Sequence, residues 1–363
     1  MPTECDVAVV GGGPAGLAAA IACAQAGRSV TVFERRRDDL DKACGEGLLP
    51  PALQALEALG VPPSFADEEH AQFQRLRYVL EDGASAEATL PGTGGVGLRR
   101  TALIRLLRVR AAQAGVELRQ EAVECIERRT AGVEINASLE CRLLVGADGL
   151  ASSVRRQVGF DRPVEPGGRY GLRLHFEIAP WDSAVEIYFG PEVEAYVTPV
   201  SPRMVGVAFL WTHRSLPHRL NAEMLLGRLP RLAEKLGGAA AVTRPRGAGP
   251  LERRTRARSA DRVVLIGDAA GYLDAITGEG LALAFRAALC LGRTVTQALE
   301  DGASRKALAA YEREYAAAYA RYLRLTRLVL ALSSRRWIRR AAVGWLRRNR
   351  PAFEALIAWG LRT

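Results

Sequence analysis

The chain begins with apolar segments whose periodicity switches from strand to helix and back. Residues 6–10 (Asp-Val-Ala-Val-Val) have strand character, and an Ala-rich stretch leads from a glycine-rich turn to Gly27. A second β-branched run, Ser-Val-Thr-Val-Phe, occupies residues 29–33. The pattern predicts a strand–helix–strand unit, which is typical of a parallel sheet in an α/β domain.

The rest of the chain divides by periodicity into strand-rich and helix-rich stretches. Period-two alternation between residues 165 and 256 predicts an antiparallel sheet with one buried face, and helical spacing predicts a helix over 98–115. The short strands between 116 and 145 are expected to form a small antiparallel insertion, and 92–97 a flexible turn. We predict strands at 73–81, 85–90, 116–119, 122–127, 132–136, 141–145, 169–177, 184–189, 194–199, 204–211 and 261–266, and further helices at 52–59, 221–235, 281–298, 302–330, 334–349 and 352–360.

This order predicts two connected domains followed by helices. A discontinuous dinucleotide-binding domain comprises residues 1–165 and 257–300, with strands of the substrate region inserted near 70–98. Residues 166–256 form an antiparallel-sheet substrate domain, and 301–363 form a C-terminal helical region.

The turn after the first strand has the spacing Gly11-x-Gly13-x-x-Gly16. The first glycine permits a tight turn, the second lets the backbone approach a pyrophosphate, and the third lets helix and strand pack closely. The helix N-terminus then offers free N–H groups to the phosphates. Glu34, which ends the second strand, can accept hydrogen bonds from both hydroxyls of an adenosine ribose. The stretch therefore predicts an ADP-containing dinucleotide.

Composition changes this picture little. The 363 residues are 48% hydrophobic, which suits a large core, and the formal charge is +10. Almost all of the excess charge is arginine, since the lysines are Lys42, Lys235 and Lys306. Such a composition is more typical of a GC-rich genome than of a nucleic-acid partner, and the chain carries no nucleic-acid-binding motif. We expect no nucleic-acid partner.

The uncharged stretch 7–27 is not expected to be a signal or a membrane segment. Its flank carries Glu4 and Asp6, and Gly-Gly-Gly-Pro interrupts any helix. We therefore expect a cytoplasmic protein. The six cysteines include no CxxC pair and the four histidines are scattered, so we predict neither a metal site nor a disulfide.

Three later motifs extend the first one. Gly146-Ala-Asp-Gly149 and Gly267-Asp-Ala-Ala270 follow predicted strands, and Gly278-Glu-Gly280 opens a helix. Together with the glycine turn and Glu34-Arg35, in this order, they resemble the FAD-dependent monooxygenase and geranylgeranyl-reductase superfamily, over roughly residues 5 to 300. The resemblance implies an α/β fold of the p-hydroxybenzoate-hydroxylase type, with a Rossmann-like FAD-binding domain, an antiparallel substrate sheet and C-terminal helices.

The resemblance also implies roles for matching residues. Arg100 reaches the FAD phosphates, with Arg99 as the alternative, and the Val123 backbone meets the adenine. Asp268 accepts the ribityl hydroxyls, and the N–H groups of Gly278-Glu-Gly280 face the N1–C2=O edge of the flavin, where negative charge develops on reduction. The cofactor-binding residues expected on this basis are Gly11, Gly13, Pro14, Ala15, Gly16, Glu34, Arg35, Cys44, Gly45, Arg100, Val123, Asp148, Gly267, Asp268, Gly278, Gly280 and Leu281.

No branch of this superfamily is matched throughout. Flavin halogenases carry Trp-x-Trp-x-Ile-Pro and geranylgeranyl reductases Tyr-x-Trp-x-Phe-Pro, where residues 194–199 read Glu-Ala-Tyr-Val-Thr-Pro. Cys44-Gly-Glu-Gly47 and Thr277-Gly-Glu-Gly280 fit the reductases. Gly271 and Ala275 stand where aromatic hydroxylases usually carry His and Pro.

We expect an FAD-dependent oxidoreductase, and first a monooxygenase that uses NAD(P)H and O2 on a hydrophobic aromatic, polyketide or isoprenoid substrate. The alternatives are a geranylgeranyl-reductase-like double-bond reductase and an FAD-binding protein without turnover. The sequence contains no second dinucleotide fold, so NAD(P)H would bind transiently. A reductase needs a proton donor, for which Cys44, Glu46 and Tyr196 are the first candidates.

Residues 334–350 predict a basic amphipathic helix. Arginines gather on one side of the helical wheel, whereas Trp337, Ile338, Ala341 and Trp345 gather on the other. Such a helix suits peripheral contact with an anionic membrane. The alternative is that the tryptophans pack over the substrate domain and the arginines are solvated.

Overall fold

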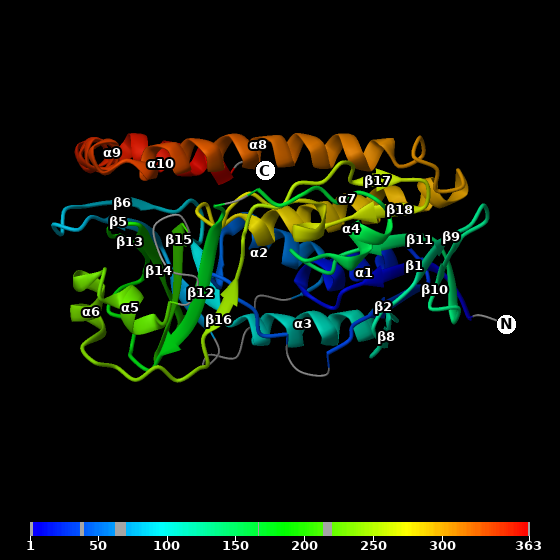
Figure 1. Ribbon diagram of the computed structural model, residues 1–363, viewed down its shortest axis with the longest axis horizontal. Coiled ribbons are helices and arrows are strands. Elements are labelled where there is room, and N and C mark those ends of the chain that lie inside the picture. Colours follow the sequence, from blue (N-terminus) through cyan, green and yellow to red (C-terminus); the bar gives the residue numbers. More distant parts are fainter. Residues whose placement is uncertain (1–2, 37–39, 62–69, 166, 213–219, 362–363) are drawn as a thin grey trace.

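The computed structural model describes residues 3–36, 40–61, 70–165, 167–212 and 220–361. A parallel sheet and a mainly antiparallel sheet lie side by side, and helix α8 (Ala309–Ser334) runs along both (Figure 1). The predicted fold class is confirmed: a Rossmann-like α/β domain with an antiparallel sheet and C-terminal helices.

The parallel sheet carries the predicted strand–helix–strand unit at its centre. β1 (Thr3–Val10) pairs in parallel with β2 (Val30–Phe33) and β11 (Leu139–Gly146), and α1 (Pro14–Gln25) connects β1 to β2. The apolar residues of β1 and β2 are buried, as expected for parallel strands covered on both faces. The sheet order is β17 (Ser259–Ala260), β18 (Val263–Leu265), β11, β1, β2 and β8 (Glu117–Arg119), and β10 (Val133–Ile135) and β9 (Ile126–Arg128) extend it beside β11.

Two short segments differ from the expectation. β8 pairs in parallel with β2, so it belongs to the main sheet, and only β9 and β10 pair as an antiparallel insertion. Residues 92–97 are not a turn throughout, because β7 (Gly95–Leu98) pairs with β3 (Gly47–Leu48) and β4 (His70–Phe73). A Cβ on Gly97 would lie 1.6 Å from the carbonyl oxygen of Pro199, so glycine here permits close approach of two backbones.

The second sheet positions the far wall of the site. Its pairs are antiparallel except that β5 (Arg75–Val79) pairs in parallel with β13 (Ala184–Phe189). The strands inserted near residues 70–98 therefore lie at the sheet edge. The order is β16 (Arg246–Ala248), β12 (Arg169–Phe176), β15 (Met204–Thr212), β14 (Val193–Ser201), β13 (Ala184–Phe189), β5 (Arg75–Val79) and β6 (Ser85–Thr89).

Alternate side chains of this sheet enter two cores. Tyr188 packs in a core closed by α5 (Ala222–Leu226) and α6 (Pro230–Leu236), whereas Ile187 faces the other core. The sequence predicts one helix over 221–235, and the structure has two because Pro230 starts a new helix and cannot continue the old one.

The remaining helices cover the sheets. α2 (Pro50–Ala58) and α7 (Gly280–Glu300) pack together, as do α1 and α7, and α3 (Arg100–Gln113) lies against α1. The short α4 (Ser153–Gln157) and the 3-10 turn η2 (Gly267–Ala270) follow β11 and β18 at the carboxyl edge of the parallel sheet. Ligands of open α/β sheets bind at this edge.

The C-terminal helices join the two halves. The buried tyrosines of α8 (Ala309–Ser334) pack in the core of the parallel sheet, whereas α9 (Arg336–Arg348) and α10 (Arg350–Leu361) pack over β6 through Val343 and Phe353. Because these helices pack against both sheets, the domain boundaries expected from the sequence remain a proposal. Across the described ranges, each helix falls short of the length or apolarity that a membrane span requires.

Candidate functional site

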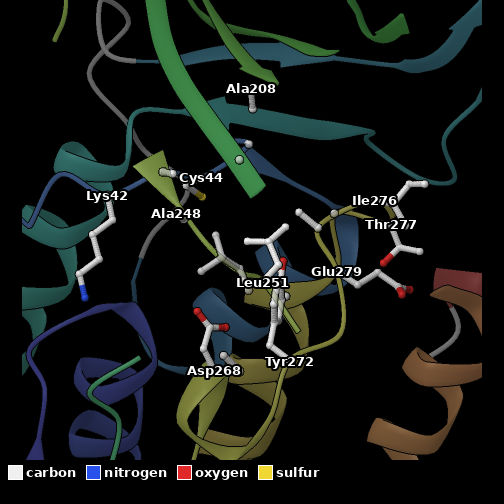
Figure 2. Close-up of a pocket in the computed structure, with 18 of the residues that line it drawn as sticks. Lys42, Cys44, Ala208, Ala248, Leu251, Asp268, Tyr272, Ile276, Thr277 and Glu279 are labelled. Atoms are coloured by element: carbon white, nitrogen blue, oxygen red, sulfur yellow. The ribbon is translucent and has the colours of Figure 1, made fainter. Parts of the chain in front are cut away.

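One cavity of about 950 Å³ lies between the glycine loop and the antiparallel sheet. Figure 2 shows Lys42, Cys44 and Asp268 on one side of it and Ile276, Thr277 and Glu279 on the other. The expected site residues that line it are Gly11, Gly13, Pro14, Ala15, Glu34, Arg35, Cys44, Gly45, Glu46, Arg100, Val123, Asp148, Tyr196, Gly267, Asp268, Gly278, Gly280 and Leu281. Gly16 does not line it.

The three glycines of the loop have different physical roles. A Cβ on Gly11 would lie 2.5 Å from the carbonyl oxygen of Ala147, and one on Gly16 would lie 1.9 Å from the carbonyl oxygen of Gly11. These two positions need glycine for the fold itself. Gly13 is different, because a Cβ there would meet only Arg100 Nη2, at 3.7 Å, and would otherwise enter the cavity. The space beside Gly13 at the N-terminus of α1 is therefore a cradle for an anion.

Two cations face this cradle. Arg100, the first residue of α3, points its guanidinium toward Gly13, and its Nε donates to the Leu40 carbonyl at 3.2 Å. Arg99 is not among the residues that line the cavity, so the geometry favours Arg100 for a phosphate contact. Lys42 also lines the cavity, with Nζ near Gly149. The sequence analysis assigned Lys42 no function.

The adenosine side of the cavity is built around Glu34. Its carboxylate accepts hydrogen bonds from the N–H groups of Gly12 at 2.9 Å and Arg36 at 3.0 Å. Each oxygen keeps a lone pair for a further donor such as a ribose hydroxyl. Val123 lines the same region, in an irregular segment before β9 and not in the strand predicted at 122–127.

Two aspartates stand at the carboxyl edge of the parallel sheet. Asp268 lies in η2, where burial raises the pKa of its carboxyl against the opposing effects of Arg100, Lys42 and Arg155. Asp148 caps α4 by accepting through Oδ2 from the N–H groups of Ser153 and Val154. Its other oxygen, Oδ1, is buried and has no hydrogen-bond partner among the described residues. A buried unpaired acceptor in a cavity wall points to a missing donor.

These features fit FAD. The glycine cradle and two cations suit a pyrophosphate, Glu34 suits the ribose, and the two aspartates suit hydroxyl groups farther along a flavin. Gly278 and Gly280 line the cavity where α7 begins, so the helix N-terminus can stabilise negative charge there.

The three candidate proton donors have different surroundings. Glu46 is buried in a left-handed backbone conformation (φ 58°), and its Oε1 accepts from the Arg100 N–H at 2.9 Å. Tyr196 donates its hydroxyl proton to the Ile276 carbonyl at 2.6 Å, and burial raises the pKa of that hydroxyl well above its usual value. Cys44 is a half-buried free thiol in the cavity wall.

Glu279 is a fourth candidate, which the sequence analysis missed. It lines the cavity, and its buried Oε2 has no hydrogen-bond partner among the described residues. Burial raises the pKa of Glu279 to about 7, although a hydrogen bond with the Thr277 side chain opposes this. Glu279 stands inside the Gly278-Glu-Gly280 motif, but the sequence analysis assigned a role only to the N–H groups and the two glycines.

The chain is similar to known flavoproteins over most of its length. A family model described as "FAD binding domain" matches residues 4–326. Digeranylgeranylglycerophospholipid reductase 1 of Methanopyrus kandleri is 30% identical over 328 residues, which cover 82% of each protein.

Two solved structures show the same fold. A geranylgeranyl bacteriochlorophyll reductase-like protein from Thermoplasma acidophilum superposes with a TM-score of 0.72 at 22% identity, covering 86% of this chain and 83% of the other. The flavin-dependent brominase Bmp2 superposes with a TM-score of 0.85 at 18% identity, covering 99% and 94%.

Proposed function

The chain belongs to the FAD-dependent monooxygenase and geranylgeranyl-reductase superfamily, and we propose that it is a reductase that saturates carbon–carbon double bonds of an isoprenoid lipid. It is an FAD-dependent oxidoreductase. The sequence motifs put a monooxygenase first and a double-bond reductase second. Relatives that match more than four-fifths of this chain carry reductase names, and this supports the second reaction better.

The observation that carries the proposal is the apolar extension of the cavity. Beyond the cofactor-binding residues the cavity continues between the second sheet and the C-terminal helices. Its walls there are aliphatic and aromatic: Leu76, Tyr78, Val185, Ile187, Phe189, Phe209, Leu328, Val329, Leu332, Val343, Leu346, Phe353, Leu356 and Ile357. A branched hydrocarbon chain is the ligand that such a wall buries most favourably.

Bound FAD would supply the hydride, after reduction by a transiently bound NAD(P)H. The chain's own residues would hold and orient the groups around it. Asp268 and Asp148 would accept hydroxyl protons of the cofactor, and the N–H groups at the start of α7 would compensate developing negative charge. The apolar walls would exclude water from the double bond.

Two cavity groups can hold a proton for the substrate. The Cys44 thiol lines the cavity, and the Glu279 carboxyl presents an unpaired Oε2 and has a pKa of about 7. Glu46 and Tyr196 are less suited to this role because each already makes a short hydrogen bond within the protein. Protonation of one alkene carbon balances hydride addition to the other.

The test compares reduction with oxygenation on one substrate. The FAD-loaded protein is reduced anaerobically with dithionite in the presence of a geranylgeranyl lipid, and products are analysed by mass spectrometry. We expect a gain of two hydrogens for each double bond. A gain of one oxygen atom with NAD(P)H in air, without hydrogen gain under anaerobic conditions, would establish the monooxygenase instead.

A lipid substrate also suits peripheral membrane contact. We propose such contact through residues 334–350, which include all of α9.

A further inference from the structure

The cavity opens at the C-terminal helices. Leu328 and Leu332 of α8 and Leu356 and Trp359 of α10 line the cavity, yet each is 40–50% exposed. Side chains that belong to both the cavity wall and the surface mark an opening. These four residues belong to the apolar part of the cavity wall, and we call the opening between them the mouth.

Exposed apolar side chains continue outside the mouth. Trp337 and Trp345 of α9 are 67% and 51% exposed, although they do not line the cavity. α9 and α10 pack on β6, and with α8 they form an outer layer of the molecule (Figure 1). We call Leu328, Leu332, Trp337, Trp345, Leu356 and Trp359 the C-terminal apolar face. Clustered exposed apolar residues of this kind mark an interaction site.

α9 buries only part of its apolar surface. Val343 and Arg339 face inward, where Arg339 donates to Glu81 at 3.0 Å and lies over the Phe189 ring. The tryptophans face outward, so the alternative in which they pack over the substrate domain is wrong. α9 thus packs Val343 into the protein but leaves its two tryptophans for a partner outside it.

The charge around this face identifies the partner. Residues 321–361 contain ten arginines and one glutamate. Arg336 and Arg340 pair with Glu81 and Asp82, but the exposed Arg324, Arg327, Arg335 and Arg347 make no ion pair within the described part of the chain. A second copy of the chain would bring like charges together, which opposes association. Anionic headgroups above an apolar layer complement both the arginines and the tryptophans.

We propose that the C-terminal apolar face docks the protein on an anionic lipid bilayer, with the cavity mouth toward the membrane. An isoprenoid lipid then passes from the bilayer into the cavity between α8 and α10. The docking stands on this surface alone, whereas the passage of substrate rests on the proposed function.

The experiment uses the FAD-loaded protein and vesicle flotation. Vesicles contain phosphatidylcholine alone or phosphatidylcholine mixed with phosphatidylglycerol. We expect binding to the mixed vesicles, weakened by salt because exposed charges contribute. The double substitution Trp337→Ser and Trp345→Ser should weaken this binding about tenfold or more. Val109→Ser with Met224→Ser is the matched control, because it removes two exposed apolar side chains of α3 and α5, and it should bind as the parent does.

Turnover measured on two forms of the substrate distinguishes a loss of docking from a loss of folding or of catalysis. The tryptophan variant should act on detergent-dispersed substrate like the parent but more slowly on vesicle-embedded substrate. Equal binding of parent and tryptophan variant to mixed vesicles would overturn the docking proposal. So would no binding by the parent, or a concentration-dependent dimer that the tryptophan substitutions abolish. Vesicle binding without any double-bond saturation would overturn the proposed function and leave the docking intact.

Discussion

Oε2 of Glu46 lies 2.5 Å from Nε2 of His175, and this buried pair ties the loop that carries Cys44 to strand β12 of the substrate sheet. Oε1 of the same carboxylate accepts from the Arg100 N–H at the start of α3. Asp41 provides a second tie, because it pairs with Arg173 of β12 and with Arg246 of β16 at 3.1 Å. Glu46 thus positions the Cys44 loop between the two sheets.

Replacing Glu46 should reveal this positioning role. Glu46→Gln keeps an acceptor for the Arg100 N–H but weakens the contact with His175, so we expect a loss of about 1–3 kcal/mol in the free energy of unfolding. Turnover should fall by no more than the accompanying loss of FAD affinity. Denaturant unfolding and FAD titration measure the two effects. A fall in turnover of about a hundredfold with unchanged stability would instead identify Glu46 as the proton donor.

The cradle beside Gly13 should be sensitive to a single methyl group. Gly13→Ala is tolerated by the protein, because the added Cβ meets only Arg100 Nη2 at 3.7 Å. It would occupy space assigned to the cofactor phosphates, so we expect FAD to bind about a hundredfold more weakly. Flavin fluorescence titration measures the affinity, and thermal unfolding of the flavin-free protein measures the fold.

A matched control exists in α9. A Cβ on Gly344 would also lie 3.7 Å from a guanidinium nitrogen, that of Arg348, but Gly344 is outside the cavity. Gly344→Ala should leave FAD affinity unchanged. If Gly13→Ala also leaves it unchanged, the cradle does not hold the phosphates.

Arg100 and Arg99 should differ although they are neighbours. Arg100 faces the glycine loop, whereas Arg99 is not part of the cavity wall, so Arg100→Met should weaken FAD binding about tenfold or more and Arg99→Met should not. Equilibrium dialysis with FAD compares the two variants. A larger effect at Arg99 would reverse the assignment that the geometry supports.

Local backbone requirements explain which features could be predicted from the sequence. The roles of Gly11 and Gly16 follow from spacing, because close backbone contacts can be satisfied only by glycine. The glycines of 92–97 were wrongly interpreted as a flexible turn. Gly97 is required by close contact with Pro199, which lies about a hundred residues away in the sequence. A glycine indicates a crowded or left-handed backbone, but it does not say what crowds it.

Side chains whose role depends on tertiary packing could not be predicted. Lys42 joins the cavity wall only because its loop folds beside Gly149. The sequence shows only that Glu279 precedes a helix. Its burial in the cavity wall, which leaves Oε2 without a partner among the described residues, depends on the tertiary fold. The exposure of Trp337 likewise depends on which side of α9 packs against β6. Periodicity identifies an amphipathic helix but cannot decide which face meets the protein.

The buried carboxyl of Glu279, whose Oε2 has no hydrogen-bond partner among the described residues, should make stability depend on pH in a defined window. Burial raises its pKa from 4.5 to about 7, so the folded protein binds more protons than the unfolded chain between these values. The free energy of unfolding therefore falls as the pH rises from about 4.5 to about 7 and this contribution is then constant. Glu279→Gln mimics the neutral carboxyl, so the excess stability of the flavin-free variant over the parent should be small near pH 5 and larger by on the order of 2 kcal/mol near pH 8.

Thermal unfolding at the two pH values measures this difference, which corresponds to about 3 °C for a chain of this length. Asp274 titrates in an overlapping range, because burial raises its pKa to about 6 against the opposing charge of Arg169. The comparison of parent and variant removes that contribution, since Asp274 is present in both. Parallel curves for the two proteins from pH 5 to pH 8 would mean that Glu279 ionises as an ordinary carboxyl. It would then hold no proton at neutral pH for the alkene, and Cys44 would remain as the cavity acid.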